Sequence, residues 1–225
     1  MPVSIAPPTA AASAEIMSVM SVSASVPVDL HETSNSSPTF RWTGDGDTYV
    51  FQIARDTAFV SLVDAATLAT VFHTPAGYYA QDTYFWRVIA RDVTGNWDTT
   101  VARRLVIDTT VNVSLSTPAD VTQTNDTTPV FTWTGDADTY LIEISNNDAT
   151  FVTVHDTKTL TTLTYEPVAK PMVAGIYYWR VTASDRLGNR KTTASRFVFI
   201  DTEVRVNLSS PADNTVSTSN RPAFV

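Results

Sequence analysis

Aspartates separated by a single residue are the side chains in this sequence best suited to binding an ion. Asp45 and Asp47 form one such pair, Asp136 and Asp138 form another, and each pair interrupts a run of apolar residues. Carboxylate oxygens are ligands that Ca2+ prefers, but a calcium loop brings several more oxygens than these short stretches supply. Aspartate also favours turns for backbone reasons. We therefore interpret both pairs as solvated turn residues and keep calcium binding as the alternative.

Asp108 and Asp201 form a second set of carboxylates, each followed directly by a threonine. Both stand where the last strand of a repeated segment is expected to end. Together with a neighbouring loop they would form a Ca2+ site that stiffens a junction between repeats. The simpler interpretation is that a charged residue ends the strand and discourages edge pairing. The sequence thus predicts no cofactor, with Ca2+ as the one alternative.

The residue types needed for catalysis are scarce. There is no cysteine, which excludes a disulfide, a thiolate zinc site and a cysteine nucleophile. His155 and Asp156 are adjacent, so on a strand they would face opposite sides. No Gly-x-Ser-x-Gly turn is present, and His73 has no counterpart in the second repeat. We therefore predict that the protein is not an enzyme.

Three aromatic residues are candidates for binding a ligand. Tyr78, Tyr79 and Trp97 fall in expected loops of the first repeated segment, where they would stack on a sugar or contact a partner protein. Isolated surface aromatics are also common. Trp97 would then simply cover the adjacent turn or a junction between repeats.

Charge and hydrophobicity exclude two classes of partner. The chain has 23 acidic and 15 basic residues, a formal charge of −8 and only three lysines, so it lacks the basic surface that nucleic acids require. No stretch supplies the roughly 20 apolar residues of a membrane helix, so we expect no membrane insertion. Zero cysteine with many Thr, Ser and Asp is common in bacterial surface proteins. We predict a secreted or cell-surface location.

An internal repeat organises these residues. Residues 37–49 match residues 128–140 at an offset of 91, and residues 84–88 match residues 177–181 at an offset of 93. A junction segment recurs three times, at 22–29, 113–120 and 206–213. The chain therefore divides into an N-terminal tail or linker (1–17), two repeats (18–110 and 111–203) and the truncated start of a third repeat (204–225).

Apolar residues within each repeat alternate with a period of two, which predicts half-buried strands. About seven short strands per repeat, separated by Gly, Asp and Asn turns, indicate an all-β fold of two tandem Greek-key β-sandwiches plus the start of a third. Residues 60–72 and 152–164 are expected to be irregular strand or loop. The expected core tryptophans are Trp42, Trp86, Trp133 and Trp179.

Three stretches of each repeat carry a resemblance to a known family. They are Pro-x-Phe-x-Trp at 38–42 and 129–133, Tyr-x-x-x-Ile at 49–53 and 140–144, and Tyr-Tyr-Trp-Arg-Val-x-Ala-x-Asp at 177–185 with a near copy at 84–92. The repeats resemble fibronectin type III-like, or bacterial Ig-like, modules over residues 18–203. The resemblance implies seven-stranded sandwiches that most often act as spacers. The Arg-Gly-Asp tripeptide that some family members use to bind integrins is absent.

The most direct functional interpretation is a non-catalytic spacer or adhesive stalk of a larger secreted or cell-surface protein, with adjacent modules of the same chain as partners. The alternative is a carbohydrate- or protein-binding accessory module of an extracellular enzyme, with surface glycans or proteins as partners. A third hypothesis is a self-assembling filament subunit. It rests on residues 204–225, where Val204, Val206 and Leu208 alternate and would add as a strand to another chain.

Overall fold

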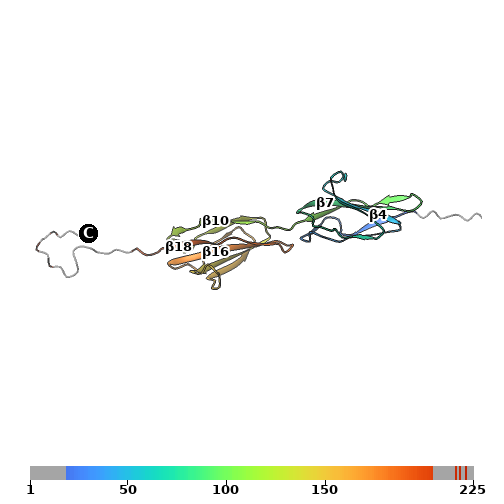
Figure 1. Cartoon of the computed structure of the whole chain (residues 1–225). Coiled ribbons are helices and arrows are strands. Elements are labelled where there is room, and N and C mark those ends of the chain that lie inside the picture. Colours follow the sequence, from blue (N-terminus) through green and yellow to red (C-terminus); the bar gives the residue numbers. More distant parts are fainter. Residues whose placement is uncertain (1–18, 205–215, 217, 219–220, 222–225) are drawn as a thin grey trace, which may run out of the picture. The chain divides into compact units, whose positions relative to one another are not determined.

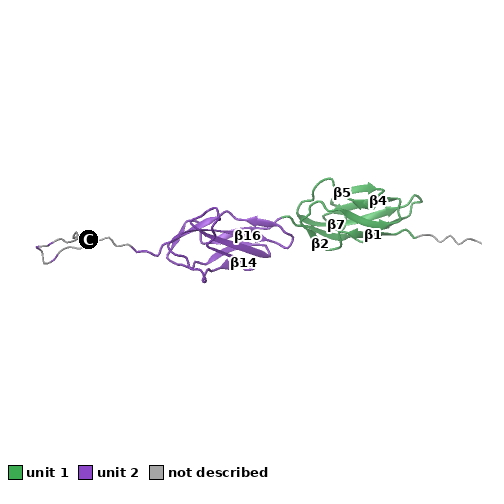
Figure 2. Cartoon of the chain, turned by 90° about the horizontal axis from the view of Figure 1, so that it is seen from below, with its two compact units in different colours: residues 1–109 green, residues 110–225 purple. Residues whose placement is uncertain are grey.

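The computed structural model describes residues 19–204 together with 216, 218 and 221. The expected tail, 1–17, and all of the expected third repeat except residue 204 and those three positions lie outside the described residues. The chain divides into two compact units, residues 1–109 and 110–225 (Figure 2). Every regular element among the described residues is a β-strand, which confirms the all-β prediction. No described element is a helix that could cross a membrane.

Unit 1 consists of two sheets. The smaller sheet has the order β1-β3-β6, and the larger has the order β2-β9-β7-β4-β5, with β8 also paired to β7. In chain order the strands are β1 (Val22–Val26), β2 (His31–Thr33), β3 (Phe40–Gly44), β4 (Thr48–Ala54), β5 (Leu62–Leu68), β6 (Phe72–His73), β7 (Asp82–Arg91), β8 (Trp97–Thr99) and β9 (Arg103–Ile107).

Unit 2 repeats this arrangement strand for strand, with sheets of order β10-β12-β15 and β11-β18-β16-β13-β14 and with β17 paired to β16 (Figure 1). Its strands are β10 (Val113–Thr117), β11 (Thr122–Thr124), β12 (Phe131–Gly135), β13 (Thr139–Asn146), β14 (Asp156–Leu160), β15 (Thr164–Tyr165), β16 (Gly175–Ser184), β17 (Arg190–Thr192) and β18 (Arg196–Ile200).

Each unit has nine strands rather than about seven. The first expected strand is split: β1 pairs with β3, a bulge follows Ala24, and β2 then pairs with β9 in the other sheet. The short strand β8, which the sequence did not predict, is the other additional strand. Residues 60–72 were expected to be irregular strand or loop, and they contain the strand β5, whose pairing with β4 is interrupted by a register shift between Asp64 and Leu62. In 152–164, β14 pairs regularly with β13.

Alternating side chains on the long central strands form the core. In β7 the residues Tyr84, Trp86, Val88 and Ala90 are fully buried, while Arg87 lies on the opposite face. The matching residues of β16 are buried in the same way. This is the burial pattern of a strand with one face on a core and one face toward solvent.

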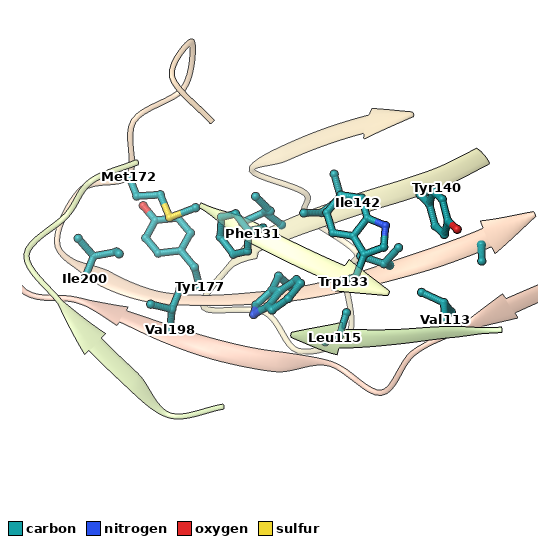
Figure 3. Close-up of a cluster of buried hydrophobic side chains, with 14 of the residues drawn as sticks. Val113, Leu115, Phe131, Trp133, Tyr140, Ile142, Met172, Tyr177, Val198 and Ile200 are labelled. Atoms are coloured by element: carbon teal, nitrogen blue, oxygen red, sulfur yellow. The ribbon is translucent and has the colours of Figure 1, made fainter. Parts of the chain in front are cut away.

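The four expected core tryptophans are buried, two in each unit. Trp179 packs edge-to-face on Phe131 with ring centroids 5.0 Å apart. Trp133 packs on Tyr140 with ring centroids 5.9 Å apart, as Figure 3 shows. The buried indole N–H groups of all four have no hydrogen-bond acceptor among the described residues. Their contribution to stability is therefore apolar packing rather than hydrogen bonding.

The chain enters and leaves each sandwich at opposite ends. In unit 1 the first strand residue, Val22, pairs with Gly44 at the end of β3. The turn after Gly44 leads into β4, whose first residue pairs with Arg91 at the end of β7. The last strand residue, Ile107, pairs with Asp82 at the start of β7. The ten residues of β7 therefore separate the two ends of the unit, by about 30 Å at ~3.3 Å per residue. Unit 2 has the same register along β16.

Candidate functional site

The paired aspartates lie in the turns that join the two sheets, where they accept hydrogen bonds from backbone amides. In unit 1, Ser21 N–H donates to Asp45 Oδ1 at 2.8 Å, and Val93 N–H donates to Asp47 Oδ2 at 2.9 Å. In unit 2, Asn112 donates to Asp136 through its backbone and its side chain, and Arg186 N–H donates to Asp138 Oδ2 at 2.7 Å. Each carboxylate thus ties its turn to a neighbouring segment.

The junction aspartates occupy matching positions at the ends of β9 and β18. Asp108 N–H donates to Thr33 O at 3.0 Å, and Asp201 N–H donates to Thr124 O at 2.8 Å, so both extend the parallel pairing of the last strand. Asp201 Oδ2 also accepts the Gln123 side-chain amide at 2.8 Å. Within residues 19–204 no three His, Cys, Asp or Glu side chains gather as a metal-ligand group.

The carboxylates are used by backbone amides, so we expect calcium to leave the stability of the protein unchanged. The midpoint of thermal unfolding should be the same in calcium and in chelator, because a ligand shifts the midpoint only when it binds the folded state preferentially. Scanning calorimetry with millimolar CaCl2 and with EDTA tests this. An upward shift in calcium that Asp136→Asn removes would instead show that the turn pair binds the ion.

The three candidate aromatics do not form one surface. Trp97 is 67% exposed on β8, opposite Arg91 at the end of β7, whereas Tyr78 is 85% exposed in the loop before the start of β7. They therefore lie at opposite ends of unit 1. The expectation that Tyr79 is exposed is wrong, since it is only 6% exposed and packs against Phe40 and Tyr84. A ligand role for Trp97 or Tyr78 stays a prediction.

The sequence did not predict a polar cluster that joins the two sheets of unit 1 around a single aspartate. Asp64 on β5 contacts His73 on β6 of the other sheet, with Oδ2 2.8 Å from His73 Nε2. The same oxygen accepts the Tyr79 hydroxyl at 3.0 Å. The nearby carboxylate and burial both raise the pKa of Tyr79, burial being the larger cause. We call this Asp64, His73 and Tyr79 arrangement the unit 1 latch.

Unit 2 has a latch at the same place with different partners. Asp156 on β14 accepts the hydroxyl of Tyr165 on β15 at 2.5 Å, and Lys170 Nζ lies 3.3 Å from its other oxygen. Burial works to raise the pKa of Asp156, but the hydrogen bonds from Tyr165 and Lys170 outweigh it and the pKa is lowered. Burial and the adjacent carboxylate raise the pKa of Tyr165 to about 12. Both latches close the sandwich where β5 or β14 is the outer strand.

A second missed element is an aspartate turn that seats a phenylalanine beneath an arginine. In unit 1 the amides of Ala58, Val60 and Ser61 donate to Asp56, and Arg87 lies 4.0 Å from the centre of the Phe59 ring. In unit 2 Asp148 and Phe151 repeat the arrangement beneath Arg180, at 4.1 Å. The stacking orders the loop against the outer face of the larger sheet.

These turns predict that stability decreases in acid. Hydrogen bonds from the Thr150 side chain and from the Thr153 and Thr150 amides lower the pKa of Asp148 to about 2. A folded pKa below the unfolded one contributes stability above the unfolded pKa, near ~4, that is lost as the pH falls through the folded value. We therefore expect the urea concentration at the unfolding midpoint of unit 2 to decrease as the pH is lowered from 4 to 2. The amide resonances of unit 2 measure this midpoint.

Asp148→Asn tests the assignment, because the amide retains an acceptor oxygen but does not titrate in this range. The pH dependence of unit 2 should become shallower in this variant, while that of unit 1 stays as it was. An unaltered slope in unit 2 would mean that other carboxylates cause the acid sensitivity.

The chain is similar to several proteins of known structure. No family model matches the chain, and no curated protein matches it. Among solved structures, the fibronectin(III)-like modules of CbhA from Clostridium thermocellum are 16% identical over 80% of this chain and 94% of that chain, with a TM-score of 0.35. The FN1-FN3 domains of chicken CNTN1 are 10% identical over 79% of this chain and 66% of that chain, with a TM-score of 0.39.

A third similar structure is dimeric latent PorU from Porphyromonas gingivalis, which is 10% identical over 82% of this chain but only 20% of that chain, with a TM-score of 0.32. The sheets themselves define the architecture of each unit. Each unit packs a three-stranded sheet on a larger sheet, the two-sheet architecture that fibronectin type III and immunoglobulin domains share. The chain contains two tandem β-sandwich units with a fibronectin type III-like fold.

Proposed function

We propose that the protein is a non-catalytic spacer or adhesive stalk segment of a larger secreted or cell-surface protein. The observation that carries the proposal is the position of the chain ends within each unit. Since the chain enters one end of a sandwich and leaves the other, each unit holds its own entry and exit points about 30 Å apart, as a spacer segment requires.

The short connection between the units supports the same function. Thr109 N–H still donates to Gln81 within unit 1, and Val111 is already buried in the core of unit 2. A connection this short has far less conformational freedom than a flexible linker. Fibronectin type III-like modules often occur in extracellular proteins.

The proposal predicts that distances add along the chain. The protein has no cysteine, so the pairs Val19→Cys with Thr109→Cys and Val19→Cys with Val204→Cys can be labelled specifically. Val19 and Val204 are 86% and 92% exposed, which keeps the labels off the cores. Single-molecule fluorescence energy transfer should give the longer pair roughly twice the separation of the shorter pair. Equal separations would mean that the units fold back on each other and would contradict the spacer.

A carbohydrate-binding accessory module remains the second candidate, and exposed Trp97 is the residue that favours it. Loss of glycan-array binding in Trp97→Ala would support that function, and array binding unaffected by the change would reject it. Self-association through residues 204–225 rests on sequence outside the described structure. A concentration-independent monomer in light scattering would reject the filament hypothesis.

A further inference from the structure

A pocket of about 420 Å3 lies in unit 2 between the outer edge of β10 and the segment 191–196. The edge of β10 is not covered by another strand here, because β10 pairs only with β12. Asp136 N–H donates to Asn112 O at 3.3 Å, so the following residue, Val113, turns its own N–H away from β12 and toward this edge.

The charged groups around the pocket differ in whether they already bind other groups of the protein. Asp120 Oδ1 accepts the amides of Val121 and Phe197, and Arg196 donates to Ser116 O and Pro118 O, so both are committed to the backbone. Lys191 has no ion pair within 4.0 Å among the described residues. Its ammonium group is close enough to Asp136 to help lower the pKa of that carboxyl, after the larger effect of the Asn112 hydrogen bonds.

In unit 1 the matching strand edge, that of β1, is covered by a side chain of the same unit. There Asp98, on β8, accepts the N–H of Val22 at 2.9 Å. Val22 begins β1 as Val113 begins β10, and Asp98 is the middle residue of β8 as Lys191 is of β17. A carboxylate thus covers the strand edge in unit 1, whereas the matching residue of the short strand in unit 2 is a lysine.

We propose that the unit 2 pocket binds the carboxylate of an external small molecule, which takes the place that the Asp98 carboxylate occupies in unit 1. The Val113 N–H would donate to one carboxylate oxygen and the Lys191 ammonium group would pair with the charge, two contacts of the charge-assisted kind. Ser114 and Ser195 also line the pocket. Hydroxyl-bearing residues suit a polyhydroxylated ligand, so a uronate sugar is the form of carboxylate in the proposal.

The test is an NMR titration of the full chain, with the Val113 amide as the reporter. Glucuronate should shift this amide saturably, acetate should shift it more weakly, and glucose should not shift it. Equal binding of acetate and glucuronate would keep the carboxylate site but remove the sugar preference. No response to either carboxylate, or tighter binding of inorganic phosphate than of both, would overturn the proposal.

Lys191→Asp provides the sharpest variant because it rebuilds the unit 1 arrangement. Without ligand, its Val113 amide should already resemble the hydrogen-bonded Val22 amide, and glucuronate affinity should fall by at least ~10-fold. Lys158→Gln removes an exposed lysine on β14, outside the pocket, and should leave binding unchanged. Binding that survives Lys191→Asp, or that Lys158→Gln weakens equally, would assign the response to net charge instead.

The reciprocal variant, Asp98→Lys, should transfer the site to unit 1. The Val22 amide would lose its internal acceptor and begin to respond to glucuronate, while Val113 continues to respond as before. If the unit 1 fold is retained and Val22 stays silent, the lysine and strand edge are insufficient for binding and the proposed pocket is wrong.

Discussion

Replacing Trp179 by alanine should destabilise unit 2 by about 3–5 kcal/mol and leave unit 1 unchanged. Trp179 is fully buried and packs on Phe131, so its removal exposes a large cavity in the unit 2 core. The two units have separate hydrophobic cores with no residue in common. In calorimetry, the unit 2 transition should therefore fall by roughly 15–30 °C while the unit 1 transition stays in place.

Two further variants make this result specific. Trp179→Phe keeps an aromatic ring and deletes an indole N–H that has no acceptor among the described residues, so it should cost much less than alanine. Trp86→Ala should reproduce the large loss in unit 1 alone. If either alanine variant lowers both transitions equally, the units are coupled in stability and the assumption of independent cores fails.

The second large effect is expected at the unit 2 latch, where Asp156→Ala should cost about 2 kcal/mol. Asp156 is 6% exposed and accepts the Tyr165 hydroxyl, so the alanine leaves a partly buried hydroxyl and the Lys170 ammonium group without their partner. Urea unfolding, followed by the amide resonances of unit 2, measures the loss.

A double-mutant cycle isolates the pair. Tyr165→Phe removes only the hydroxyl and should cost less than Asp156→Ala. The double variant should be more stable than the sum of the two single losses predicts, since both changes remove the same hydrogen bond. Fully additive losses would mean that Asp156 contributes through other contacts and that the latch does not join the sheets energetically.

Local patterning was sufficient to predict the sandwich and its core. Period-two alternation in residues 84–90 and 177–183 sets one face of a strand inward, and large aromatics at those positions have no place except the core. The repeat added independent support, because each core tryptophan recurs at the same place in both units. The turn aspartates were also predictable, although not the particular amides that they bind.

The latches were not predictable, because their residues are brought together by pairing between sheets. The repeat offset changes from 91 to 93 across this stretch, and Asp64 and Asp156 match at 92, inside the segment whose alignment is ambiguous. Their partners also differ in type, His73 in one unit and Tyr165 in the other. No single residue pattern therefore marks the feature.

Tyr79 illustrates a signal that was present in the sequence. Side chains of adjacent residues in extended backbone point to opposite sides, so Tyr78 and Tyr79 are not expected to share one exposed surface. Tyr79 N–H donates to Ser36 O just as Met172 N–H donates to Thr127 O, which makes Met172 its counterpart. An apolar residue at the matching repeat position indicates burial, and Met172 is 1% exposed.

The parallel pairing of β2 with β9 has a mechanical consequence. Tension applied through the chain pulls the N-terminal side of β2 and the C-terminal side of β9 in opposite directions along the same axis. The hydrogen bonds between His31–Thr33 and Leu105–Ile107 lie across that axis and are therefore loaded together rather than opened one after another. Asp108 N–H adds a further bond to Thr33 O. Each unit thus resists stretching by the simultaneous shear of these hydrogen bonds. If the terminal strands were antiparallel, the same tension would open their hydrogen bonds one after another.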